Sequence, residues 1–167
     1  IVTINPANFT NSAAVNIEIE TGAFTDLATN SYAGIADANT WNFTIIDADL
    51  TPPAVTVYSP IDNATNTNIS SNLVLTFSET VIKGTGNILI KEAGIITQTI
   101  DVTAASVTVA GNIVTINPSD FGYSAAVNIE IAAGAFKDLA NNDYVGIADA
   151  TTWNFNTEAA PSGPQTF

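Results

Sequence analysis

Hydrophobic and polar residues alternate along much of this chain, which is the pattern of β-strands with one buried face. Turns rich in glycine and asparagine, such as Glu92-Ala93-Gly94, separate the alternating stretches. No stretch has the period of a helix longer than one or two turns. The chain is therefore predicted to be all-β, with strands at 54–58, 72–77, 87–92, 97–103, 106–110, 112–117, 126–131 and 151–156.

Short strands at this spacing, rich in threonine and valine, indicate an antiparallel β-sandwich. Two tryptophans, Trp41 and Trp153, each fall close to the end of a set of strands. We expect each of them to anchor a core from the last strand of its set, because a large aromatic side chain gains most from burial.

The chain repeats itself with an offset of about 112 residues, a long period that indicates tandem copies of a domain rather than a solenoid. IVTINPANF at 1–9 matches IVTINPSDF at 113–121, and SAAVNIEI at 12–19 recurs at 124–131. The segment 22–43 likewise matches 134–155. Roughly three quarters of residues 1–44 are identical to their partners. The first copy therefore corresponds only to the second half of the later one.

This repeat predicts four segments. They are the C-terminal half of a repeat at 1–46, an Asp/Pro linker at 47–53, a complete repeat at 54–157 and a linker to a next repeat at 158–167. The adjacent prolines Pro52 and Pro53 restrict the backbone, so the first joint is expected to be stiff.

Three stretches of the complete copy resemble the bacterial Ig-like repeats of S-layer proteins and large surface adhesins. They are TPPAVTVYSPIDNATN at 51–66, LVLTFSETV at 73–81 and GAFKDLANNDYVGI at 134–147. The most specific pieces are FSE at 77–79 and KDLAN at 137–141. The resemblance implies tandem Ig-like antiparallel β-sandwiches, one of them a partial half-copy, in a protein that is exported to the cell surface. It implies a spacer or adhesive stalk without catalysis.

The charge of the chain restricts its partners. Sixteen acidic residues, three lysines and no arginine give a net charge of −13. This charge repels phosphate backbones and anionic lipid heads, so nucleic acid and membrane-surface partners are not expected.

No apolar run approaches the roughly 20 residues of a membrane span. The chain also has no cysteine and no histidine, which excludes disulfides, Cys/His zinc sites and thiol or imidazole catalysis.

Four acidic residues form a candidate calcium site at the joint between copies. If the sandwich has seven principal strands, the incoming linker, the turn after 73–77 and the loop that holds Asp138 are expected at the same end. Asp47 and Asp49 of the linker would then approach Glu79 and Asp138. A calcium ion would relieve the repulsion among these carboxylates and stiffen the joint. Calcium-stiffened joints also occur among the stalks that the chain resembles.

Other acidic residues have simpler interpretations. Asp138, Asp143 and Asp149 are oxygen ligands of the kind that calcium prefers, but their spacing is not that of an EF-hand. Aspartate is also an ordinary turn residue that bonds the nearby backbone. Glu18 and Glu130 point away from the core, and nothing places a second acid opposite either of them. Enzymatic activity is therefore not expected.

The half-copy leaves two interpretations of function open. In the first, the chain is a spacer segment of an extracellular or cell-surface bacterial protein, its partners are adjacent repeats of the same protein, and the half-copy is a truncated domain. In the second, the chain is a filament subunit whose half-domain is completed by strand addition from identical subunits, because its strands have an apolar face and open edges. A carbohydrate-binding module comes third. It needs a row of exposed aromatic residues, whereas Tyr32, Tyr144 and the tryptophans are expected to anchor loops and cores.

Overall fold

The computed structural model describes residues 1–163, so the last four residues of the predicted linker 158–167 lie outside the described residues. The chain divides into two compact units, Ile1–Asp49 and Leu50–Phe167. Each unit is described by itself below.

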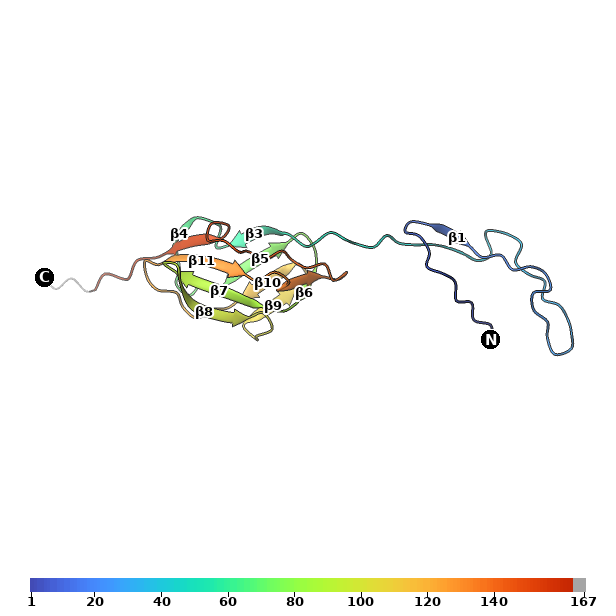
Figure 1. Cartoon of the computed structure of the whole chain (residues 1–167). Coiled ribbons are helices and arrows are strands. Elements are labelled where there is room, and N and C mark those ends of the chain that lie inside the picture. Colours follow the sequence, from blue (N-terminus) through green and yellow to red (C-terminus); the bar gives the residue numbers. More distant parts are fainter. Residues whose placement is uncertain (164–167) are drawn as a thin grey trace. The chain divides into compact units, whose positions relative to one another are not determined.

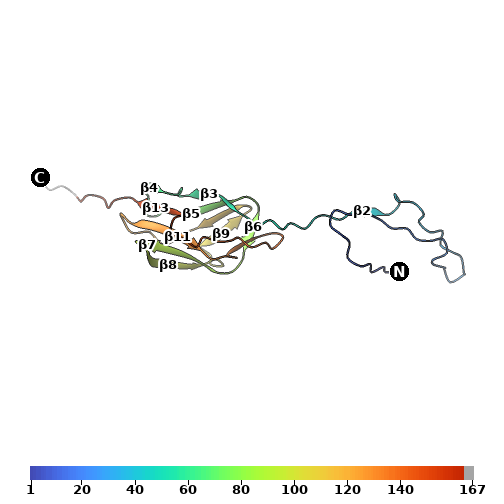
Figure 2. The same cartoon turned by 45° about the horizontal axis from the view of Figure 1, so that its top comes forward.

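The second unit is a sandwich of two main β-sheets (Figure 1). The four-stranded sheet has the order β3 (Val55–Ser59), β5 (Leu73–Phe77), β10 (Ile113–Ile116) and β9 (Val107–Ala110). The five-stranded sheet has the order β4 (Ala64–Thr67), β13 (Asn154–Thr157), β11 (Ala126–Ile131), β7 (Asn87–Glu92) and β8 (Ile95–Asp101), and Figure 2 shows its strands side by side. All neighbouring strands are antiparallel except β13 and β4, which run parallel.

A third, small sheet closes one end of the sandwich. It pairs β6 (Val81–Lys83) with β12 (Phe136–Asp138), so that Asp138 lies opposite Val81. The second unit thus contains the strands β3 to β13. The expected segments all contain strands, but β4, β6 and β12 were missed because three or four residues are too short to show an alternation.

The core lies between the two main sheets and is built from alternate residues of the strands. In β5, Leu73, Leu75 and Phe77 are buried whereas the two residues between them are only half-buried. Trp153 is fully buried, as expected, just before the last strand. Its ring lies 5.1 Å from that of Tyr58, and its indole N–H donates a hydrogen bond to the Pro60 carbonyl. The all-β sandwich predicted from the alternation is thus confirmed.

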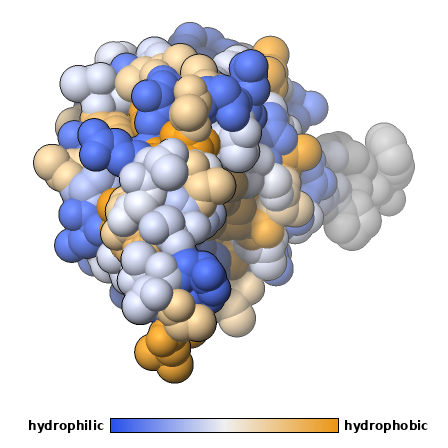
Figure 3. All heavy atoms as spheres, turned by 90° about the vertical axis from the view of Figure 1, so that its right-hand side faces the viewer, coloured by the Kyte–Doolittle hydropathy of each residue, from blue (hydrophilic) through white to orange (hydrophobic). Residues whose placement is uncertain are grey.

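The first unit contains one small sheet, β1 (Ala14–Asn16) paired with β2 (Asn42–Thr44). None of its residues is buried, and Trp41 is 43 % exposed where its counterpart Trp153 is 0 % exposed. The expectation that Trp41 anchors a core was therefore wrong, because this unit lacks the strands that would cover it. A space-filling view of the chain shows hydrophobic residues at the surface among hydrophilic ones (Figure 3).

Candidate metal site

Three of the four predicted ligands come together at one end of the sandwich. One carboxylate oxygen each from Asp49, Glu79 and Asp138 lies within 4.8 Å of the others. Asp49 is exposed, Glu79 is half-buried and Asp138 is buried. Calcium binds oxygen ligands at about 2.3–2.6 Å, so two oxygens on opposite sides of one ion lie about 5 Å apart. The spacing of the three carboxylates is therefore suitable for a shared divalent cation.

Backbone pairing explains why these residues meet. Glu79 lies in the turn between β5 and β6, and Asp138 ends β12, which pairs with β6. The start of β3 is held beside the same turn, because the backbone N–H of Ala54 donates to the Ser78 hydroxyl and the Ser78 N–H donates to the Ala54 carbonyl. Asp49 lies five residues before Ala54, and its carboxylate reaches this turn.

Asp138 also has a role that needs no metal. Its two carboxylate oxygens accept hydrogen bonds from the backbone N–H and the side-chain amide of Asn142, at 2.8 and 2.7 Å. Burial opposes ionisation of this carboxyl, but the hydrogen bonds from Asn142 and from the backbone of Ala140 and Asn141 outweigh it and lower its pKa. The carboxylate is thus charged and holds the loop after β12 closed.

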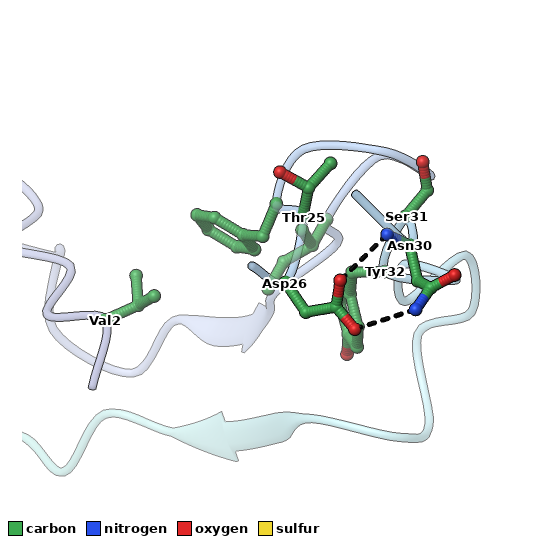
Figure 4. A pocket seen from close by; sticks show the side chains of 8 residues that line it. Val2, Thr25, Asp26, Asn30, Ser31 and Tyr32 are labelled. Atoms are coloured by element: carbon green, nitrogen blue, oxygen red, sulfur yellow. Dashed lines mark hydrogen bonds between the residues drawn. The ribbon is translucent and has the colours of Figure 1, made fainter. Parts of the chain in front are cut away.

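The first copy supports this local role. Asp26, the counterpart of Asp138, accepts the same pair of hydrogen bonds from Asn30, at 2.8 and 2.9 Å (Figure 4). The loop therefore forms in a unit that has no counterpart of Glu79. Asn30 and Asn142 were not identified from the sequence, although their recurrence four residues after each aspartate was the available signal.

The other acidic candidates do not join this group. Asp47 accepts a hydrogen bond from the Ser12 hydroxyl at 2.6 Å, within the first unit. Asp143 forms an ion pair with Lys137 at 2.9 Å. Asp149 caps the following turn through the backbone and hydroxyl groups of Thr151 and Thr152. Among the described residues, only Asp49, Glu79 and Asp138 form a cluster of this kind.

Glu130 is engaged in an ion pair rather than in a pair of acids. Its carboxylate contacts the ammonium group of Lys91, which lies on the neighbouring strand β7. Both side chains are about one-fifth exposed, so the pair lies at the edge of the solvent. This arrangement accounts for a carboxylate at this position of the strand without a catalytic role.

The first unit contains a hollow that the sequence did not predict. It has a volume of about 530 Å³ and is lined by Val2, Ile19, Phe24, Thr25, Asp26, Asn30, Ser31 and Tyr32 (Figure 4). Apolar side chains form much of this lining, and the unit buries none of them.

The described part of the chain has no helix that is long and apolar enough to cross a membrane.

Comparison with known proteins identifies the second unit. The sequence profile of the bacterial Ig-like domain matches residues 49–157, which includes Asp49, Glu79 and Asp138. Such domains are generally non-catalytic and are typically found in surface-exposed proteins. A search of curated proteins found no match. The boundaries 1–46, 47–53, 54–157 and 158–167 stay a prediction.

Proposed function

Because this chain belongs to the bacterial Ig-like domain family, we propose that it is a non-catalytic spacer segment of a bacterial cell-surface protein of the adhesin or S-layer type. The path of the chain through the second unit carries this proposal. The chain reaches β3 at one end of the sandwich and leaves after β13 at the other end (Figure 1). Domains that are entered and left at opposite ends add length to a stalk when they are repeated.

The packing of the second unit suits such a role. Its first strand, β3, belongs to the four-stranded sheet and its last strand, β13, to the five-stranded sheet. A pull on the two ends therefore acts across the core that joins the sheets. Large side chains such as Trp153, Phe77 and Phe155 fill that core. Their burial stabilises the domain by roughly 2 kcal/mol each, which favours one cooperative folding unit.

We further propose that calcium binds Asp49, Glu79 and Asp138 and stiffens the chain where it enters the domain. The three carboxylate oxygens within 4.8 Å support this proposal. Two like charges at such a distance repel by about 1 kcal/mol in water and more at a partly buried site. A bound divalent ion would replace this repulsion with attraction and would restrict the residues that precede β3.

Thermal unfolding tests the calcium site. At a calcium concentration a hundred times its dissociation constant, the folded domain should gain about 2.7 kcal/mol, which raises the midpoint by about 10 °C over a chelator control. Asp49→Asn and Glu79→Gln should abolish most of this shift. Asp47→Asn is the matched control and should keep it, because Asp47 bonds Ser12 instead. An equal shift in Asp49→Asn, or no shift in the parent chain, would exclude the site.

The location of the protein on the cell tests the proposed spacer role independently of calcium binding. Antibodies raised against the second unit should label intact cells of the source bacterium, and protease added outside the cells should remove the label. Labelling that appears only after the cells are broken would contradict a cell-surface role.

A further inference from the structure

One buried polar group of the second unit has no partner that explains its burial. Asn128 lies within β11, and only 8 % of its surface is exposed. Its side-chain amide nitrogen Nδ2 is buried and has no hydrogen-bond partner among the described residues. A buried donor without a partner costs free energy, and such groups are rare in folded proteins. The Asn128 amide therefore points to a role besides packing.

The amide of Asn128 shares one face of the five-stranded sheet with an amine and a carboxylate. Asn128 lies directly opposite Lys91 of the neighbouring strand β7. Ile90 and Ile129 are fully buried, so the residues next to them in these strands lie on the opposite, outer face. Lys91, Asn128 and Glu130 are consequently neighbours on that face.

The neighbour of Asn128 on its other side is already occupied. Asn154 of β13 lies directly opposite Asn128, but its amide donates to the Asp62 carboxylate and the Thr151 carbonyl, at 3.0 and 3.3 Å. Asn128 and Asn154 also line a surface hollow of about 310 Å³. A small molecule can therefore enter or leave beside the Asn128 amide.

The carboxylate of Glu130 is placed to reach both the amine and the amide. Its Oε1 lies 2.5 Å from the Lys91 Nζ. The same sequence in the first copy, SAAVNIEI at 12–19, shows the second contact, because the Asn16 Nδ2 donates to the Glu18 Oε1 at 3.1 Å. The ion pair alone accounts for the lysine and the glutamate of the second unit, but it leaves the asparagine amide unexplained.

These three groups are the reactants and the proton carrier of a transamidation. A neutral lysine amine is a nucleophile, and an adjacent carboxylate can take up and return its protons. Residues directly opposite one another in antiparallel strands have Cβ atoms about 4.5–5.5 Å apart, within reach of a lysine side chain. The strand register therefore holds the amine and the carboxamide together, which favours a reaction between them.

We propose that Lys91 and Asn128 form an intramolecular isopeptide bond with Glu130 as the proton carrier. Glu130 takes a proton from the Lys91 ammonium, and the neutral Nζ attacks Cγ of Asn128. The bond from Nζ to Cγ forms and the bond from Cγ to Nδ2 breaks. Glu130 transfers protons to the leaving nitrogen, which departs as ammonium, and the carboxylate is restored. The reaction needs no oxidant, reductant or cofactor.

The bond would remove the unpartnered group and tie two strands together. The Nδ2 amino group leaves, and the N–H that remains on Nζ can donate to Glu130. The cross-link joins β7 to β11 and closes a covalent loop from Lys91 to Asn128. This is a single self-modification without turnover on a substrate, so the domain stays non-catalytic. It depends neither on the spacer role nor on the calcium site.

The mass of the full chain under denaturing conditions tests the proposal. The folded and purified protein should be lighter than its sequence by about 17 Da, the mass of the ammonia that leaves. Lys91→Arg keeps a cation beside Glu130 but replaces the nucleophile with a guanidinium, so it should have the full mass. Glu130→Gln should also have the full mass. The full mass in the folded parent chain would overturn the proposal.

The same substitution in the first copy provides the matched control. Glu18→Gln changes the corresponding carboxylate, whose contact is with Asn16 rather than with a lysine. The mass loss should be the same in this variant as in the parent chain. A full mass in Glu18→Gln would contradict the assignment of the proton carrier to Glu130.

Trypsin locates the bond, because it cleaves after lysine and the chain has three lysines and no arginine. Acylation of Lys91 should block cleavage there, so residues 84–137 should be recovered as one peptide that is about 17 Da light. Cleavage after Lys91 in a chain that has lost ammonia would overturn the proposal, because an asparagine would then have closed on its own backbone.

Asn128→Asp distinguishes the reacting asparagine from the others in the chain. This variant should lose water, about 18 Da, in place of ammonia, since the leaving group is now an oxygen. Loss of ammonia from Asn128→Asp would show that another asparagine reacts and would overturn the assignment.

Discussion

At the scale of single residues, aspartate side chains fix the turns of this chain. Asp149 accepts hydrogen bonds from the backbone N–H and hydroxyl groups of Thr151 and Thr152, at 2.7–2.8 Å. The hydroxyls and then the backbone N–H groups lower the pKa of this carboxyl well below its usual range. Asp37 in the first copy is held by Thr40 and Asn39 in the same way. The interpretation of Asp149 as a turn residue rather than a metal ligand therefore agrees with its contacts.

The lowered pKa of Asp149 predicts a pH dependence. A carboxyl with a lower pKa in the folded state stabilises that state above its unfolded pKa of about 3.9, and the contribution is lost as the pH falls further. In urea unfolding between pH 7 and pH 2.5, the parent chain should lose more stability below about pH 4 than Asp149→Ala does. Parallel curves for the two proteins would show that these hydrogen bonds do not favour the ionised form.

At the scale of elements, the small sheet of β6 and β12 brings the candidate metal site together. Its strands have three residues each, and only their mutual pairing identifies them. Gly84 follows β6 and donates its backbone N–H to the Ala135 carbonyl at 2.8 Å. A Cβ on Gly84 would lie 2.0 Å from the Gly134 carbonyl oxygen. Glycine is therefore required here by the close approach of two backbones.

Gly84→Ala should separate β6 from the loop before β12. We expect the free energy of unfolding of the second unit to fall by about 1–3 kcal/mol, because the backbone must move to admit the methyl group. Gly163→Ala is the control and should have no effect, since no described residue lies within 4 Å of the place that its methyl group would take. Calorimetry of both variants checks this, and an unchanged midpoint for Gly84→Ala would contradict the tight contact.

At the scale of the whole molecule, two nearly identical sequences have different burial. Ile129 is fully buried between neighbouring strands, whereas its counterpart Ile17 is only half-buried. The residues around both positions are the same, SAAVNIEI. The difference therefore comes from the presence or absence of the segment that covers the strand.

The same substitution in the two copies should have different costs. Ile129→Ala should reduce the free energy of unfolding of the second unit by about 2–5 kcal/mol through lost burial and a cavity. Ile17→Ala should change it by less than about 0.5 kcal/mol, because its side chain lies outside a packed core. Chemical denaturation followed by Trp153 fluorescence in a Trp41→Phe background measures both. Similar losses would mean that the first unit contributes to the fold of the second.

Local features of this protein could be predicted from the sequence. The alternation located strands such as 87–92 and 126–131, and the repeat showed that residues 1–44 match the second half of the later copy. Both features are local or depend on comparing the chain with itself, so no knowledge of spatial neighbours was needed. The end of the sandwich at which Glu79 and Asp138 meet followed from the expected topology.

Only the tertiary structure decided which residues have partners in space. Asp47 and Asp49 are two residues apart in the linker, yet only Asp49 lies with Glu79 and Asp138. Short strands such as β12 and the single two-stranded sheet of the first unit were also not visible in the pattern. The physical reason is that alternation records which face a strand buries, whereas pairing and side-chain contacts depend on segments far apart in the chain. For this chain, the sequence determined what each half-repeat is made of, and the tertiary structure determined which half is covered.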